Sequence, residues 1–297
     1  MALSDKQGLF AKDTLTKDEK IDVEEIAVIS KLFDDLHMHE LVLDLLAQPP
    51  NNETRNFLYY QQGQLIGYLG IDDYGTREKD FVVIVYPDFR RKGIARLLLQ
   101  AAKEEARHSG IEQLVLRCEH TSTTGAAFAH AIHAQPAYSE HEMELGTFQQ
   151  RPVYRKHVTI REAYGPHDLA AVVSVMASEM GSVEQAQQYM TEVAKHDNQR
   201  FYLMTLTSPE VGSDKPIGSL RLVDASASMG IYGFVVRPEY RGKGYGRQLL
   251  QQVLYERRGS VEPIMLAVDV TNTNALGLYL SCGFEIKTTY DYYNIAM

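Results

Sequence analysis

The chain carries the same basic, glycine-containing loop twice, at an interval of 151 residues. Positions 86 to 99 read YPDFRRKGIARLLL, and positions 237 to 250 read RPEYRGKGYGRQLL. The same offset relates Gly67 to Gly218 and Val85 to Val236. Because solenoid repeats have periods of roughly 20–50 residues, an offset of this size indicates duplication of a whole domain.

The duplication predicts two domains of one plan, residues 1–150 and 151–297, in agreement with roughly 100–200 residues per domain. Each half contains a helical segment, short β-rich runs, the loop with a helix, an apolar strand, and a last helix and strand. This order predicts an α/β (α+β) fold, with helices packed on a sheet in each half. The helices before and after the loops are expected over residues 23–46, 96–108, 168–181 and 247–258.

The net charge of −9 lies entirely in the first half, where 15 Lys and Arg face 24 Asp and Glu, while the second half has 15 of each. An acidic chain repels a phosphate backbone, so we expect no nucleic-acid partner. The apolar stretches fall well short of the roughly 20 residues that span a bilayer, and the first residues do not resemble a signal peptide. Two cysteines, Cys118 and Cys282, are too few for a disulfide framework. We therefore expect a cytoplasmic protein with no membrane attachment.

The three glycines of the second loop stand directly before a predicted helix. Glycine permits positive φ and lets a ligand approach the backbone closely. The first amide N–H groups of a helix lack intrahelical partners and favour an anion. The loop therefore predicts a cradle for a phosphate or pyrophosphate group, and a plain strand-to-helix turn is the alternative. The Walker and dinucleotide patterns do not fit, because no Gly-Lys-Ser/Thr follows Gly246 and Arg247 occupies the place of the last glycine.

Two motifs of the second half resemble those of the GNAT superfamily of N-acyltransferases. Val236 to Gly246, VRPEYRGKGYG, is similar to the acetyl-CoA loop of that family, Arg/Gln-x-x-Gly-x-Gly/Ala. Asn272 to Phe284, NTNALGLYLSCGF, is similar to its second motif, Asn-x-x-Ala-x-x-Leu-Tyr-x-x-x-Gly-Phe. The resemblance covers most of residues 158–297 and, more weakly, residues 20–148. It implies two tandem domains, each with a mixed, mostly antiparallel central sheet flanked by helices.

The resemblance also implies which residues bind acetyl-CoA. The backbone of Phe234, Val235 and Val236 is expected to bond the pantetheine arm and the thioester oxygen. Asn272, or Asn274 close by, is expected to contact the CoA arm, and Asn272 also suits a helix N-cap. The pyrophosphate is expected on the loop and the first turn of the helix, that is on Arg241, Gly242, Lys243, Gly244, Tyr245, Gly246 and Arg247.

Tyr279 matches the tyrosine that lies near the CoA sulfur in the family. The resemblance implies that an amine attacks the thioester directly and that Tyr279 gives a proton to the departing thiolate, since a phenol has a pKa of ~10. The alternative role of Tyr279 is that of a core aromatic residue. Many family members carry a glutamate base on the strand before the loop, but the strand MGIYGFVV contains no carboxylate. Asp224, Glu239 and Asp269 are nearby in sequence, and Tyr232 and the TTYDYY cluster are candidates for the acceptor pocket.

The first half retains the loop but departs from the second motif. Its sequence RRKGIA fits the loop signature, which implies weaker CoA contacts at Val85, Arg90, Arg91, Lys92, Gly93, Ile94 and Ala95. Aligned on the aromatic end of the motif, His133 stands in place of the tyrosine, and Ala126 and Ala137 replace the asparagine and the glycine. We therefore interpret the first half as a degenerate domain, with acid catalysis by His133 as a further alternative.

The leading interpretation is an N-acyltransferase that moves an acetyl group from acetyl-CoA to a primary amine, with its active site in the second half. The expected acceptor is the amine of a small molecule or a peptide, and no metal-ligand spacing is found in the sequence. The alternative is a catalytically silent CoA-binding sensor or scaffold protein.

Overall fold

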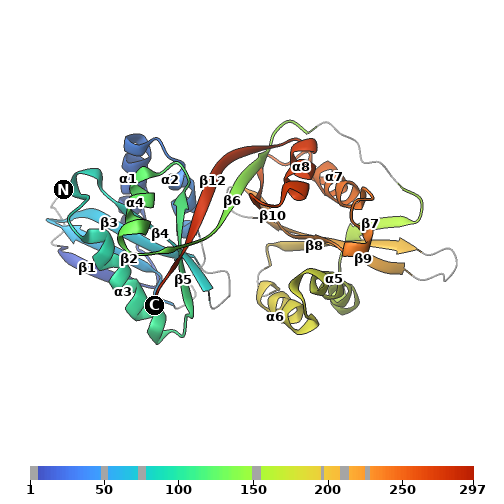
Figure 1. Ribbon diagram of the computed structural model, residues 1–297, viewed down its shortest axis with the longest axis horizontal. Helices are drawn as coiled ribbons and strands as arrows, with labels where there is room; N and C mark the ends of the chain where they lie inside the picture. Colours follow the sequence, from blue (N-terminus) through green and yellow to red (C-terminus); the bar gives the residue numbers. More distant parts are fainter. Residues whose placement is uncertain are drawn as a thin grey trace. The chain divides into compact units, whose positions relative to one another are not determined.

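The computed structural model describes residues 6–47, 53–72, 78–148, 155–194, 197–207, 214–224 and 228–297. The chain folds into two compact units (Figure 1). Unit 1 comprises Met1–Glu140 together with Thr288–Met297, and unit 2 comprises His141–Lys287. Each unit contains both helices and strands, and its sheet is mostly antiparallel.

The division between the units differs from the one predicted after residue 150. That position lies outside the described residues, and the compact units divide after Glu140. The end of the chain joins unit 1 because β12 (Phe284–Ile295) pairs antiparallel with β5 (Gln113–Glu119), from Tyr290 opposite Glu119 to Ile295 opposite Leu114. The C-terminal strand therefore completes the sheet of the first unit.

Unit 1 has the strand order β1-β2-β3-β4-β5-β12. Its further strands are β1 (Gly8–Lys12), β2 (Asn56–Gln61), β3 (Gln64–Asp72), β4 (Glu78–Val85) and the first part of β6 (Gln135–Leu145). Its helices are α1 (Lys17–Asp34), α2 (Met38–Ala47), η1 (Pro87–Phe89), α3 (Ile94–His108) and α4 (Thr123–Ala131). The one long helix predicted over residues 23–46 is thus two helices, because Asp35 takes a left-handed conformation with φ 55° and ends α1.

Unit 2 repeats the plan with the strand order β6-β11-β10-β9-β8-β7. Its strands are β7 (Val158–Glu162), β8 (Gln199–Thr207), β9 (Asp214–Asp224), β10 (Met229–Val236) and β11 (Ile264–Asp269). Its helices are α5 (Gly165–Met180), α6 (Val183–Val193), η2 (Pro238–Tyr240), α7 (Tyr245–Arg257) and α8 (Thr273–Ser281). Helix α6 was not predicted from the sequence.

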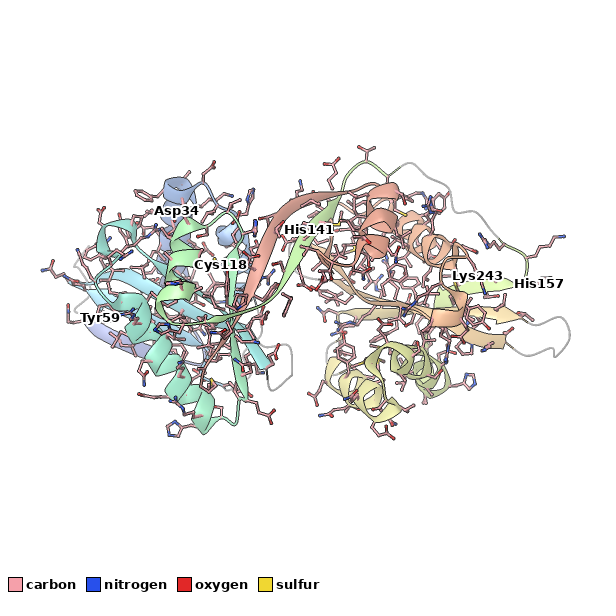
Figure 2. All side chains as sticks on the ribbon, in the orientation of Figure 1. Asp34, Tyr59, Cys118, His141, His157 and Lys243 are labelled. Atoms are coloured by element: carbon pink, nitrogen blue, oxygen red, sulfur yellow. The ribbon has the colours of Figure 1, made fainter. Side chains whose placement is uncertain are left out.

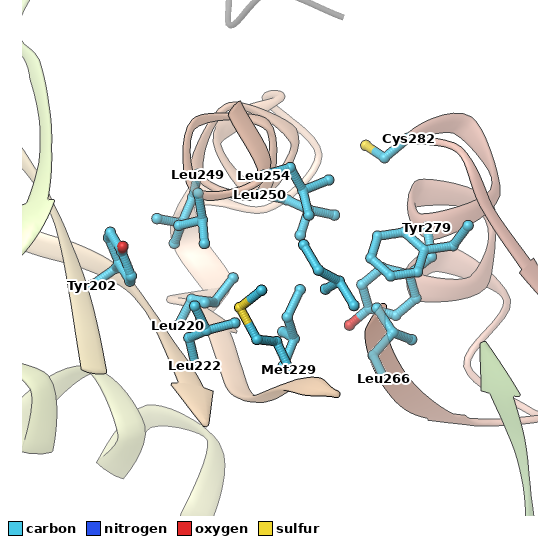
Figure 3. Packing of buried hydrophobic residues seen from close by; sticks show 14 of the residues in the cluster. Tyr202, Leu220, Leu222, Met229, Leu249, Leu250, Leu254, Leu266, Tyr279 and Cys282 are labelled. Atoms are coloured by element: carbon cyan, nitrogen blue, oxygen red, sulfur yellow. The ribbon is translucent and has the colours of Figure 1, made fainter. Parts of the chain in front are cut away.

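The sheet of unit 2 has a different pair of helices on each face (Figure 1). On one face α7 and α8 close a core to which Leu249, Leu250, Val253 and Leu254 of α7 contribute, all of them fully buried (Figure 3). This is the i, i+1, i+4, i+5 pattern that indicated a helix after the loop. Burying each such side chain stabilises the fold by about 1.5–3 kcal/mol. On the opposite face α5 and α6 cover a second core, which includes Val235 of β10.

The sheet of unit 1 is covered in the same way. Alternate residues of β4 belong to two different cores: Val82 and Ile84 pack with α1 and α2, and Phe81 packs with α3. The helix after the loop therefore lies on one face of each sheet, and the first two helices of each unit lie on the other. In the described part of the chain, none of the helices combines the length and the apolarity needed to cross a bilayer.

Candidate functional site

Strands β10 and β11 of unit 2 separate several residues before the loop begins. Residues 229–231 of β10 pair in parallel with residues 264–266 of β11, and the pairing ends there. Both strands continue beyond this point, β10 to Val236 and β11 to Asp269. On its other side β10 carries a bulge between Tyr232 and Val235, where Gly233 has φ +51°. On the β11 side the backbone of Phe234 to Val236 therefore has no ladder partner. The Val236 carbonyl accepts from Arg241, and the other N–H and C=O groups on that side are left for a ligand.

The loop ends in a left-handed glycine at the start of α7. Gly242 has φ +70° and Gly244, the N-cap residue of α7, has φ +83°. No side chain caps this helix end, so the first amides of α7 have no capping acceptor. Gly246 is the second residue of α7, where an added Cβ would make only ordinary contacts with Leu278, Phe234 and Val236, at 3.5–3.6 Å. The N-terminus of α7 thus has the open, glycine-lined form that was predicted.

Two of the basic loop residues support the loop itself. The Arg241 guanidinium donates from Nε to the Val236 carbonyl oxygen at 2.8 Å and also pairs with the Glu179 carboxylate of α5. Lys243, which is labelled in Figure 2, donates to the Glu239 carbonyl oxygen at 2.7 Å. Both cations therefore hold the loop against the end of β10 and against η2.

Unit 1 holds its loop in the same way. The Arg90 guanidinium donates to the Val85 carbonyl oxygen at 3.0 Å and makes a two-pronged pair with Asp34 of α1, at 2.8 and 2.7 Å. Lys92 donates to the Asp88 carbonyl oxygen at 3.0 Å. Asp34 lies at the end of α1 (Figure 2). The equivalent bonds in the two units show that the predicted loop residues share a structural role.

Two other arginines of unit 2 add positive charge at the start of α7. Arg247 is exposed in the first turn of the helix. Arg155 was missed in the sequence, because it lies next to the predicted domain boundary after residue 150 and outside both motifs. Its guanidinium lies over the ring of Tyr245 at 5.3 Å, and an added Cβ on Gly244 would lie only 2.6 Å from its Nη2 atom. Arg155 therefore contributes charge to the candidate anion site.

Helix α8 brings its tyrosine to this region. Tyr279 is buried, with 8% of its surface exposed, and its ring lies 6.2 Å from Phe234 of β10 and 6.0 Å from Phe284. Burial raises the pKa of Tyr279 to about 12, with a smaller contribution from Cys282. Figure 3 shows Tyr279 entering the core from α8 beside Leu266. The phenol is therefore protonated at neutral pH and lies near the separated strands.

The asparagines of the second motif lie at the start of α8. Asn272 is the N-cap residue, and its Oδ1 accepts from the Ala275 amide at 3.1 Å. Asn274 is exposed in the first turn. The capping role of Asn272 is thus present in the structure, and the exposed position of both residues is compatible with a contact to the CoA arm.

The alignment of the second motif in unit 1 was wrong by four residues. Ser122 caps α4 through the Gly125 amide, as Asn272 caps α8. Counting from these caps, the buried Ala129 stands in the place of Tyr279. His133 stands in the place of the helix-ending Gly283 and is exposed, and both have positive φ, 57° and 96°. His133 is therefore a helix-terminating residue, and its position no longer supports the alternative that it replaces the tyrosine as an acid.

The strand before the loop also differs between the units. Strand β4 pairs with β3 in one continuous register, from Gly67 opposite Val85 to Asp72 opposite Asp80, and so lacks the bulge of β10. In the loop of unit 1, Arg91 has φ 64° where unit 2 has a glycine. Unit 1 thus has the same left-handed backbone at this position, but with an arginine, for which that conformation costs more free energy than for glycine.

Asp80 is a titratable residue that the sequence interpretation missed. It lies on β4, on the face that α1 and α2 cover, and burial raises its pKa to about 7, which the nearby Arg117 opposes. Arg117 in turn lies over the ring of Tyr290, at 4.5 Å. The only sequence signal for a buried acid here was the run EKD directly before an apolar strand. Charged runs of this kind are usually exposed to solvent, so the sequence did not single out Asp80.

The carboxylates considered as bases for unit 2 have structural partners. Asp224 pairs with Arg200 at 2.8 Å, the exposed Glu239 lies 3.6 Å from Lys215, and Asp269 accepts from the Thr271 amide at 2.7 Å. β10 itself has no carboxylate, as its sequence indicated. The TTYDYY cluster at 288–293 belongs to unit 1, where it pairs with β5, so it does not line a pocket within unit 2.

The separated strands, the glycine-ended loop and the tyrosine helix occur together in an α/β unit with helices on both faces of its sheet. Comparison with known proteins shows which family has this arrangement. Residues 23–133 and 172–284 both match the Acetyltransferase (GNAT) family, and together they make up most of the chain. The chain therefore belongs to the GNAT acetyltransferase family, as two tandem domains. No curated protein matches the sequence.

Several solved structures, one of them described as a tandem GNAT protein, have a similar fold. A GCN5-related N-acetyltransferase from Sphaerobacter thermophilus is 20% identical with a TM-score of 0.73, and the match covers 99% of this chain and 96% of that one. A tandem GNAT protein from the clavulanic acid biosynthesis pathway is 18% identical with a TM-score of 0.67, with 96% and 97% covered. A putative acetyltransferase from Pyrococcus horikoshii is 15% identical with a TM-score of 0.59, with 100% and 92% covered. At these identities the likeness concerns the fold alone.

Proposed function

We propose that this protein transfers an acetyl group from acetyl-CoA to a primary amine and that unit 2 contains the working site. Membership of the GNAT family supports acyl transfer from an acyl-CoA. The observation that carries the assignment to unit 2 is the meeting of the bulged β10, the glycine-ended α7 and Tyr279 of α8 in that unit. Unit 1 has the loop, but it has Ala129 in the place of the tyrosine and no bulge in β4.

The residues of unit 2 fit acetyl-CoA as a co-substrate. The left-handed Gly242 and Gly244 carry no Cβ that would block a pyrophosphate from the amides of α7. Arg155 and Arg247 supply positive charge at the same helix end. The backbone of Phe234 to Val236, which has no strand partner on the β11 side, is suited to hold the pantetheine arm and to donate to the thioester oxygen, which becomes more negative as the amine attacks.

In this mechanism Tyr279 acts on the leaving group. The amine forms a bond to the thioester carbon, the carbon–sulfur bond breaks, and the sulfur leaves as a thiolate. A thiol has a pKa of ~8.5, so full transfer from a phenol whose pKa is about 12 is uphill, and a hydrogen bond from Tyr279 to the thiolate is the stronger expectation. Stabilising the thiolate as it forms lowers the barrier to its departure.

The second candidate function is a CoA-binding protein without catalysis. What favours it is the lack of any carboxylate on β10 to take the proton of an ammonium group. The two candidates differ in one assay, the release of CoA thiol from acetyl-CoA in the presence of a panel of primary amines. Amine-dependent release by the wild-type chain supports the enzyme. Tight acetyl-CoA binding with no amine-dependent release contradicts it and supports the silent binding protein.

A further inference from the structure

Arg221 places a cation on the face of unit 2 that α5 and α6 cover. Its neighbours on β9, Leu220 and Leu222, are buried in the core beneath α7, so the Arg221 side chain points to the opposite face. There it lies directly opposite Tyr232 of β10, which is 46% exposed. Tyr232 is the last residue before the bulge, so Arg221 stands at the edge of the separated strands.

The guanidinium is held in a fixed position. Its Nη1 donates to the Gln199 side-chain oxygen at 2.7 Å, and its central carbon lies 4.9 Å from the Tyr232 ring and 5.3 Å from the Tyr189 ring of α6. Its Nε is buried and has no hydrogen-bond partner in the described part of the chain. The geometry therefore orients a planar donor group between two aromatic rings.

In the described part of the chain Arg221 lacks an acidic partner and in this differs from Arg161 and Arg200 of the same unit, although not from Arg237 and Arg257, which also donate to uncharged acceptors. Arg161 pairs with Asp168, and Arg200 pairs with Asp224. Among the residues that the structure describes, no carboxylate lies within ion-pair distance of Arg221. A part-buried cation without a counter-charge costs free energy, and a bound anion would recover it.

The position of Arg221 and its single positive charge together limit which kind of anion it can bind. Val235, whose backbone edge is proposed to face the thioester, pairs with Ser219, two residues before Arg221 on β9. At roughly 3.3 Å per residue, Arg221 is about 7 Å along the strand from that point. One guanidinium with one charge suits a carboxylate monoanion better than a phosphate dianion, which needs more donors. A small molecule bound here would reach the thioester with its amine and Arg221 with its carboxylate.

We propose that the acceptor of unit 2 is an amino acid whose carboxylate is bound by Arg221. This proposal rests on the proposed function, because it names the class of amine that the same site acetylates. Arg221 is then a specificity-determining residue that contacts the acceptor, and Tyr189 and Tyr232 orient it.

The test compares each amino acid with two neutral relatives of the same side chain. The twenty proteinogenic amino acids, their primary amides and the available decarboxylated amines (for example L-phenylalanine, L-phenylalaninamide and 2-phenylethylamine) are assayed by CoA thiol release. We expect at least one amino acid to be preferred over both relatives by about 30-fold or more in kcat/KM, the size of a buried charge-pair contact. In Arg221→Gln this preference should disappear, mainly through a higher KM for the acid, with the neutral amines unchanged.

Two further variants separate recognition from folding. Arg221→Lys keeps the charge and should retain part of the preference, and Arg200→Gln, on the neighbouring strand and already paired with Asp224, should leave the preference unaltered. If Arg221 merely supports the packing of α6, Arg221→Gln lowers the melting temperature and reduces the rates for all three members of a set equally. That result overturns the inference.

The outcomes also distinguish this inference from the proposed function. If the wild-type chain acetylates amides and amines as well as the acids, the inference is wrong and the proposed function stands. Acetyl-CoA binding by calorimetry with no acetylation of any member overturns the inference as well. If acetyl-CoA does not bind at all, the proposed function fails, and the inference fails with it.

Discussion

Replacing one glycine in each loop by alanine tests which unit binds acetyl-CoA. Gly93 and Gly244 are equivalent N-cap residues with nearly the same backbone, φ +86° and +83°. A left-handed conformation costs a residue with a Cβ about 1–2 kcal/mol, so Gly93→Ala and Gly244→Ala should lose similar amounts of stability. Each variant thus serves as the control for the strain in the other.

The surroundings of the two added methyl groups differ little in energy. At Gly93 nothing lies within 4 Å of the new Cβ, and at Gly244 the 2.6 Å contact is with Nη2 of Arg155, the far end of a flexible side chain. Function should differ strongly, because strain at Gly244 shifts the amides that are proposed to hold the pyrophosphate. Losing one charge-assisted hydrogen bond of about 1.5–3 kcal/mol weakens binding by roughly 10- to 150-fold.

The measurements are acetyl-CoA affinity by calorimetry, kcat/KM by thiol release and a thermal melt for each variant. We expect Gly244→Ala to lose affinity and turnover by that factor and Gly93→Ala to keep most of its turnover. Unchanged affinity in a folded Gly244→Ala protein refutes the proposed position of the pyrophosphate. Loss of turnover in Gly93→Ala alone would mean that the two units have the opposite roles.

Three other changes test single residues. Tyr279→Phe keeps the ring between Phe234 and Phe284, so the melting temperature should stay near wild type while kcat falls by about 10²-fold; near-normal kcat, with chemistry rate-limiting, would contradict the role on the leaving group. Arg91→Gly relieves a left-handed side chain and should stabilise unit 1 by about 0.5–1 kcal/mol, seen as a higher urea midpoint; a lower midpoint would show that the arginine side chain contributes more than its backbone strain costs. Asp80 has a folded pKa of about 7, above its unfolded value of about 3.8, so the folded state loses stability as pH rises from about 4 to 7, by a few kcal/mol at most. Asp80→Asn should therefore match wild type near pH 4 and melt several degrees higher at pH 8; an equal difference at both pH values would rule out titration of Asp80 as the cause.

Local sequence signals predicted much of the candidate site. The positive φ of Gly242 and Gly244, the capping role of Asn272 and the apolar face of α7 each depend on a few neighbouring residues. Such features are decided within one or two turns of chain, so the residue types and their spacing are enough to predict them. The duplication strengthened these predictions, because the same loop conformation occurs in both units.

The features that were missed depend on contacts between distant segments. β12 pairs with β5 across more than 160 residues of chain, and its alternating tyrosines indicate a strand without indicating which strand it joins. The bulge of β10 had a local signal, Gly233 inside a strand, but its position depends on the register with β9. The motif of unit 1 was misaligned because its aromatic residues were weighted above the cap at Ser122, which is the feature that the two helices share.

The charge of Arg221 on the α5–α6 face of unit 2 affects how an acceptor amine loses its proton when no carboxylate is available as a base. An amine must lose its proton before it attacks, and β10 offers no carboxylate to take it. A nearby cation disfavours the ammonium form and lowers the pKa of an amine, whereas a carboxylate favours that form. An amino acid bound at Arg221 is therefore in a site that promotes loss of its proton, because the guanidinium both repels the ammonium and neutralises the carboxylate that otherwise stabilises it. The proton can then leave to solvent past the half-exposed Tyr232. On this reasoning the two features are linked: because Arg221 lies opposite β10 and lowers the pKa of the bound amine, β10 does not need a carboxylate to take the proton.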